Sequence, residues 1–146
     1  MINSLTELFI RDLTKLKDEI NAYADESKLW ITAKEINNSA GTLCLHLVGN
    51  LKHFLGATLG NTGFVRDRDA EFTQKNVPRA ELVKGIDEAI AAVKTTLDLL
   101  DEQNLAKPYP IDFYKKQGST AFYLLHFSSH LNYHLGQINY HRRLLS

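Results

Sequence analysis

The sequence has little of several things that would place it in a particular class: one cysteine, three prolines and no excess of charge of either sign. One cysteine cannot form a disulfide within the chain and is typical of a reducing compartment. The 17 basic and 17 acidic residues give a formal net charge of zero, whereas nucleic-acid-binding domains usually carry a basic excess. We therefore expect neither a disulfide-stabilised scaffold nor a partner among nucleic acids.

Long hydrophobic runs are missing as well. No stretch approaches the roughly 18 consecutive apolar residues of a membrane-spanning helix. The first residues, MINSLTELFIRDLTKLKDE, are charged throughout and contain no apolar signal region. At 146 residues, the chain has the usual size of one domain with its own core. These features predict a single cytoplasmic domain over residues 1–146 that does not contact a membrane.

Four segments contain apolar residues at the spacing of an amphipathic helix. They cover about residues 5–23, 39–59, 79–100 and 120–145, and the last two follow Pro78 and Ser119, which suit a helix start. No segment alternates like a half-buried strand. The pattern therefore predicts an all-α fold, a four-helix bundle.

The connections between these helices differ in length. The segment LGNTGFVRDRDAEFTQKN, residues 59–76, shows no clear periodicity. Connections this long are uncommon in compact domains and often cross the bundle. The other long connection, residues 105–118, holds two prolines that favour extended backbone. We therefore predict a long crossover between helices 2 and 3, which lets these two helices run parallel, in place of simple up-and-down order.

Histidines are concentrated on the fourth predicted helix. His126, His130 and His134 are spaced i, i+4, i+8, so they share one face with Gln137 and His141. Two imidazoles one helical turn apart can bind one metal ion, and catalytic zinc sites commonly take three protein ligands and leave one position open. We expect His126 in the core or a pocket wall, and His141, beside two arginines, near solvent.

A second polar stripe on the second predicted helix offers the third ligand. His46, Asn50 and His53 are spaced i, i+4, i+7 among apolar neighbours. Buried polar groups need partners, and a metal is one partner that two facing rows of histidine can share. The spacing does not choose between His46 and His53. It also allows the plainer interpretation that the histidines pack the helices without a metal. Cys44 faces away from His46 and is not expected to be a ligand.

The stretches LHLVGNLKHFLGATLGNTGFVRDRDAEF, residues 45–72, and HLNYHLGQINYHRRL, residues 130–144, resemble the DinB-like (DinB/YfiT-like) family. The HxxxHxGQ pattern and the HL dipeptide on helix two carry the resemblance. It implies an up-down-down-up four-helix bundle, often a homodimer, that binds a divalent metal. The implied ligands are His46, His130 and His134. Residues that orient them or line the pocket are Asn50, His53, His126 and Gln137.

The resemblance implies a zinc or nickel ion, with manganese and iron as further options, and a small-molecule substrate. One hypothesis is a transferase that uses a low-molecular-weight thiol, which the metal holds as the thiolate. An alternative is a hydrolase in which the metal activates water. No acidic base accompanies the histidines on their helices, which favours the thiol. A third hypothesis is a non-catalytic dimeric bundle whose metal is structural or absent. Arg66 and Arg68 of the crossover could meet an anionic substrate or form local salt bridges.

Overall fold

The computed structural model describes residues 1–111 and 117–145 of the chain. Its elements are α1 (Ile2–Ala22), η1 (Glu26–Trp30), α2 (Ala40–Leu51), η2 (Lys52–Ala57), α3 (Arg68–Thr73), α4 (Arg79–Asp98), α5 (Glu102–Ala106) and α6 (Thr120–Leu145). The described ranges contain no strand, apart from one isolated bridge between Pro108 and Ser119. The prediction of an all-α fold is confirmed.

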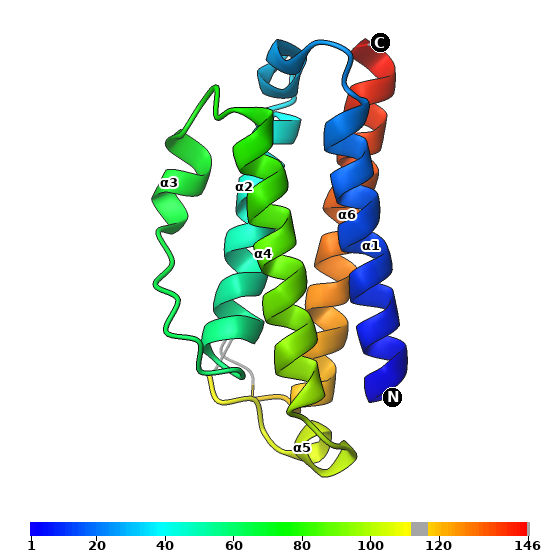
Figure 1. Cartoon of the computed structure of the whole chain (residues 1–146), viewed down its shortest axis with the longest axis vertical. Coiled ribbons are helices and arrows are strands. Elements are labelled where there is room, and N and C mark those ends of the chain that lie inside the picture. The colour runs from blue at the N-terminus through cyan, green and yellow to red at the C-terminus, as the bar shows by residue number, and fades with distance from the viewer. Residues whose placement is uncertain (112–116, 146) are drawn as a thin grey trace.

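Four long segments lie side by side along the molecule: α1, α2 with η2, α4, and α6 (Figure 1). In Figure 1, α1 runs toward the end that holds the C-terminus and α2 returns from it. The connection after η2 then takes the chain back along the length of the molecule, so that α2 and α4 run in the same direction. No described helix is long and apolar enough to span a membrane.

The core lies between these four segments and consists of their apolar stripes. On α1 the buried apolar side chains follow the helical period and are Leu5, Phe9, Leu13, Leu16 and Ile20. Fully burying a side chain of this size stabilises the fold by about 1.5–3 kcal/mol. The histidine-bearing helices α2 and α6 pack against each other in the same core, so their facing surfaces are held in a fixed register.

The helix starts follow local capping chemistry. The Ser39 hydroxyl accepts a hydrogen bond from the Thr42 backbone N–H at 3.2 Å and caps α2. Pro78 is the N-cap residue of α4. At the start of α6, the Ser119 hydroxyl accepts from the Phe122 backbone N–H at 3.1 Å. Each cap satisfies or avoids one of the free N–H groups of a first helical turn.

The segment 59–76, whose sequence shows no clear periodicity, contains a short helix. The side chain of Asp67 accepts a hydrogen bond from the Ala70 backbone N–H and caps the six-residue helix α3. A helix this short cannot show apolar periodicity over several turns, so only its cap is visible in the sequence. In the connection 105–118, residues 112–116 lie outside the described residues.

The second helix does not stay α-helical to its end. From Lys52 to Ala57 it continues as the π-helix η2. Such widened turns are rare in proteins, and those that occur are often found at functional sites. This segment carries His53. Because the π-turn changes the number of residues per turn, face assignments made with a period of 3.6 do not extend through it.

Candidate metal centre

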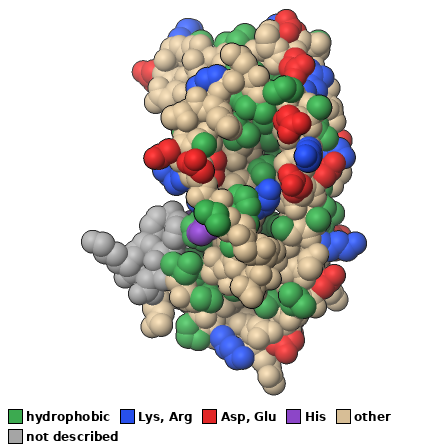
Figure 2. Space-filling view, turned by 60° about the vertical axis from the view of Figure 1, so that its left-hand side comes forward, with side chains coloured by type: hydrophobic (Ala, Val, Ile, Leu, Met, Phe, Trp, Pro, Cys, Tyr) green, Lys and Arg blue, Asp and Glu red, His purple; other side chains and the backbone are tan. Residues whose placement is uncertain are grey.

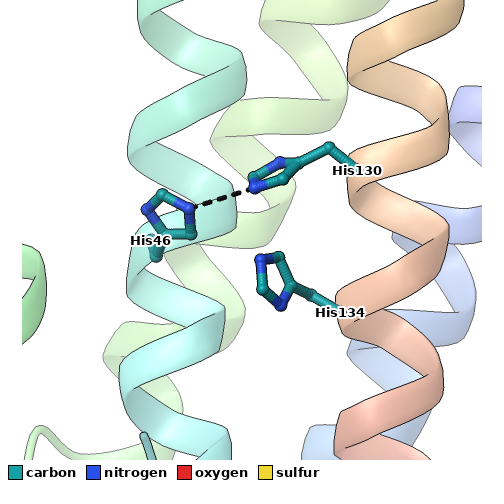
Figure 3. Close-up of side chains that lie close together, drawn as sticks. All are labelled: His46, His130 and His134. Carbon is teal, nitrogen blue, oxygen red and sulfur yellow. Dashed lines mark hydrogen bonds between the residues drawn. The ribbon is translucent and has the colours of Figure 1, made fainter.

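Three histidines from two helices converge in the interior of the helical assembly. His46 comes from α2, and His130 and His134 come from consecutive turns of α6 (Figure 3). Nε2 of His46 and Nε2 of His130 are 3.2 Å apart. One ring nitrogen of each histidine lies within 4.8 Å of the others, so the three residues could hold one metal ion.

The His46 ring is fixed by a carboxylate from α3. Its Nδ1–H donates to Oε1 of Glu71 at 3.1 Å, which leaves the lone pair on Nε2 facing the other two histidines. Both His46 and Glu71 are buried. A carboxylate that accepts the second N–H of an imidazole sets its tautomer and raises its basicity as a ligand.

Arg66 holds Glu71 in place from the other side. Its guanidinium donates from Nε to Oε2 at 2.7 Å and from its terminal nitrogen to Oε1 at 2.9 Å. Burial alone would raise the pKa of Glu71, but the hydrogen bonds from His46 and Arg66 outweigh burial and lower this pKa below its usual value. Glu71 is therefore ionised at neutral pH and carries the charge that a cationic centre would need nearby.

The approach of Glu71 to α2 depends on Gly49. A Cβ atom at this position would overlap with the side-chain carboxylate of Glu71. Gly49 lies within α2, where glycine costs about 0.5–1 kcal/mol relative to alanine. The absence of a side chain at Gly49 leaves room for the α3 carboxylate beside the helix.

His134 is oriented by the next turn of its own helix. Its Nδ1 lies 2.7 Å from the amide oxygen of Gln137. Because an amide oxygen can only accept, Nδ1 carries the hydrogen and Nε2 keeps its lone pair. Burial, followed by the charge of His46, lowers the pKa of His134, although the hydrogen bond to Gln137 opposes this change.

His130 is neutral over a wide pH range. Burial, and then the neighbouring imidazoles of His134 and His46, lower its pKa to about 4. Its Nδ1 is buried without a hydrogen-bond partner, and so is Oδ1 of Asn50. Both residues line a cavity of about 270 Å³, so this cavity contains polar atoms that the protein alone does not satisfy.

The donor set fits a divalent transition metal. Three imidazoles, each offering one ring nitrogen within 4.8 Å of the others, suit zinc, nickel, iron or copper. Two nitrogens bound tetrahedrally at about 2.0–2.1 Å from zinc are about 3.3–3.4 Å apart, close to the 3.2 Å between His46 and His130.

The whole chain can be assigned to a family. A family model described as "Protein of unknown function (DUF1572)" matches residues 2–146. The chain belongs to the DUF1572 family. A search of curated proteins found no match to this DUF1572 chain.

The cavity beside the histidines has a mixed lining in this DUF1572 chain. It is lined by His46, Asn50, Phe54, Arg66, Arg68, His126 and His130. On the face that Figure 2 brings forward, histidine surface is visible beside hydrophobic side chains. Phe54 is an apolar residue of this lining, and its ring stacks on that of Phe127 with 4.8 Å between the centroids.

His53 and Asn50, the other two residues of the polar stripe on the second helix, differ in their surroundings. His53, in η2, packs its ring against Phe54 and is not among the described residues that line the cavity. Asn50 lines the cavity, where its Oδ1 has no hydrogen-bond partner among the described residues. Cys44 is fully buried, and burial raises its pKa to about 12.

The expectation that His141 lies near solvent is wrong for this DUF1572 chain. Its ring is buried. Nε2 lies 2.8 Å from the Ile31 carbonyl oxygen, so it carries the hydrogen, and Nδ1 accepts from the Tyr23 hydroxyl at 2.6 Å. The neighbouring Arg142 turns toward Glu19, with 2.6 Å between Nε and the carboxylate. His141 therefore connects α6 to α1 and η1.

The sequence reasoning missed Glu71, the only carboxylate that the described residues place against a histidine of this group. The inference that no acidic residue accompanies the stripe considered only the histidine-bearing helices. Two signals were present: the Asp67 cap of a short helix, and the glycine at position 49 in the interior of α2. A glycine in such a place often marks the close approach of another group.

Proposed function

We propose that this DUF1572 protein is a DinB-like, divalent-metal-binding enzyme that transfers a low-molecular-weight thiol to a small electrophilic substrate. Zinc and nickel are the preferred metals. The observation that supports the proposal is the convergence of His46, His130 and His134, which place one ring nitrogen each within 4.8 Å of the others, with Nε2 of His46 next to Nε2 of His130. Two of these rings already have the outer hydrogen bonds that metal ligands need.

The scaffold supports the DinB-like assignment. The four long segments, with α2 and α4 pointing the same way, fit an up-down-down-up bundle in which α3 and α5 belong to connections. The HxxxHxGQ pattern places His130, His134 and Gln137 on α6, where Gln137 bonds to His134. In this proposal the two histidines of the pattern are metal ligands, and the amide of Gln137 orients the ring of His134.

A bound divalent metal supplies a Lewis acid that lowers the pKa of a thiol or water. The chain's own residues do the rest. Glu71 and Gln137 hold the imidazole rings of His46 and His134, so little reorganisation is needed on metal binding. Phe54, stacked on Phe127, gives the cavity an apolar side chain. Arg66 keeps Glu71 ionised and in place.

The lining of the cavity favours thiol chemistry over hydrolysis. Hydrolysis generally uses a general base to take a proton from water, and no Asp or Glu is among the described residues that line this cavity. Glu71 is occupied by His46 and Arg66. A thiol needs less help, because its pKa is near 8.5 before a metal lowers it further. The hydrolase alternative would depend on His126, which lines the cavity.

The proposal is tested by metal analysis of untagged protein purified without chelators or metal-affinity resin. We expect about one equivalent of a transition metal in the parent and none in His130→Ala/His134→Ala. His53→Ala is the matched control, because it removes a histidine of the same stripe as His46 and should keep the metal. No metal in the parent, even after zinc, nickel or manganese is added, would contradict the proposal.

A structural site predicts a different result. If a fourth protein ligand closes the site, added thiol will not change the spectrum of cobalt-substituted protein, and loss of that ligand will reduce metal content. An open site will bind thiol and develop a sulfur-to-cobalt absorption band. The homodimer that the resemblance implies is also a proposal, and light scattering at micromolar concentration tests it.

A further inference from the structure

We propose that the groove between α6 and the segment before α2 binds the apolar body of the substrate. The ligand class is a neutral molecule whose short alkyl or aryl body lies in the groove and whose head reaches the three histidines. This inference rests on the proposed function and adds the substrate class to it.

The groove begins at the histidine group. It has a volume of about 570 Å³, and His134 with its partner Gln137 is part of its wall. Small-molecule sites typically enclose about 300–1,000 Å³ and combine apolar walls with a few polar groups. A ligand in the groove would therefore have its inner end against a metal ligand and its outer end toward solvent.

Apolar side chains gather along the groove. Leu43 is buried at its base, while Ile36, Tyr133, Tyr140 and Leu144 line it and are 46%, 65%, 64% and 67% exposed. Single exposed apolar residues are common on protein surfaces, but a cluster beside a cavity marks a binding surface. Aromatic rings at the rim give a large contact area at a low cost in conformational entropy.

The charges of the groove set it apart from the smaller cavity. Glu35 is the one acidic residue, and no lysine or arginine is among the described residues that line the groove. Its buried histidine, His141, has both ring nitrogens bonded, to Tyr23 and to the Ile31 carbonyl, so it is not available to a ligand. The groove thus offers an anionic ligand no cation and suits a neutral body.

The smaller cavity beside His46 and His130 contains the positively charged side chains that the described lining of the groove lacks. It measures about 270 Å³ and is lined by Arg66 and Arg68. His46 and His130 line this cavity, whereas His134 lines the groove. The histidine group therefore lies where a polar cavity and an apolar groove come together. A substrate with a polar head and an apolar body matches this division.

The test is a chain-length series on the full chain loaded with cobalt. Ethanethiol, propanethiol, butanethiol and hexanethiol are titrated, and the sulfur-to-cobalt absorption band gives each dissociation constant. Burying one methylene group is worth a factor of about three to four in affinity. We expect affinity to rise by about this factor for each added methylene until the ligand reaches the end of the groove.

Two variants connect the effect to the groove. In Tyr140→Ser/Leu144→Ser, ethanethiol should bind with the same dissociation constant as in the parent. The factor by which each added methylene raises the affinity should fall toward one. Leu99→Ser is the matched control, because Leu99 is as exposed as Leu144, at 67%, and lies at the end of α4, away from the groove. This control should keep the full gain. Equal thermal midpoints for the variants would exclude a folding defect.

The outcomes separate this inference from the proposed function. A band with ethanethiol that does not strengthen with chain length overturns the groove inference and leaves the metal site intact. A chain-length gain that survives in Tyr140→Ser/Leu144→Ser, or that is lost equally in Leu99→Ser, also overturns it. Cobalt uptake without any thiol band contradicts the proposed thiol chemistry and, with it, this inference.

Discussion

The carboxylate of Glu71 lies 3.1 Å from Nδ1 of His46, although 25 residues separate the two along the chain. The contact fixes which nitrogen of His46 faces His130 and His134. It also makes the α2–α4 connection part of the site, since α3 carries the carboxylate. The orientation of His46 thus depends on a segment outside the helices that supply the ligands.

Removing the Glu71 carboxylate should weaken metal binding without abolishing it. Loss of such an outer partner typically costs 10–100-fold in metal affinity, so we expect about this decrease for Glu71→Ala. Glu71→Gln keeps an acceptor for the His46 N–H and should lose less. Competition with a chromophoric chelator measures both. Glu81→Ala, at an exposed acidic residue of α4, is the control, and an equal decrease there would contradict the assigned role.

Substitution of Gly49 should affect stability and the site together. In Gly49→Ala the added Cβ overlaps with the Glu71 carboxylate, so either Glu71 or α2 must shift. We expect a loss of about 1–3 kcal/mol in the free energy of unfolding and weaker metal binding. Gly136→Ala is the matched control on α6, because its Cβ would have no atom within 4 Å. It should stabilise the protein by about 0.5–1 kcal/mol. Urea unfolding of both variants gives the comparison.

The metal-free protein should lose stability in mild acid because of its buried histidines. The pKa of His130 falls to about 4 from an ordinary value of 6.5, so between these values the unfolded chain takes up a proton that the folded protein does not. The free energy of unfolding should therefore decrease as the pH falls from about 6.5 to 4. In His130→Gln the decrease should be shallower. Urea titrations at pH 7, 6 and 5 test this, and parallel curves for the two proteins would contradict it.

The Tyr23–His141 hydrogen bond should contribute to stability and not to metal binding. In Tyr23→Phe, the buried Nδ1 of His141 loses its donor, and an unsatisfied buried group costs about 1–3 kcal/mol. Thermal unfolding measures the loss. Metal content should be unchanged, because both residues lie outside the three-histidine group. Tyr140→Phe, at an exposed tyrosine of α6, should leave the midpoint unchanged.

The helices could be predicted because their apolar periods extend over several turns. Core residues such as Leu13 and Leu16 recur on one face of α1, and the cap at Ser39 begins α2 where the pattern begins. The helix α3 could not be found this way, because six residues make less than two turns. Its position depends on a long-range contact with α2 that has no local sequence pattern.

The histidine pair on α6 could be predicted because i, i+4 spacing fixes two side chains on one face. The choice between His46 and His53 could not, because both lie on the same face of an ideal helix. In the structure the π-helix begins at Lys52, so His53 no longer shares a face with His46, and its ring packs against Phe54.

The burial of His141 could not be predicted from its neighbours in the sequence. The adjacent Arg142 indicated an exposed position, but its guanidinium binds Glu19 of α1.

Cys44 is the one cysteine of the chain, fully buried, with its pKa raised to about 12. Only the thiolate reacts with maleimides and disulfides, so the folded protein should be inert to these reagents. A cysteine introduced at Thr73, an exposed residue at the end of α3, would then be the single reactive thiol. A fluorophore attached there would report movement of α3 away from the histidines without background labelling.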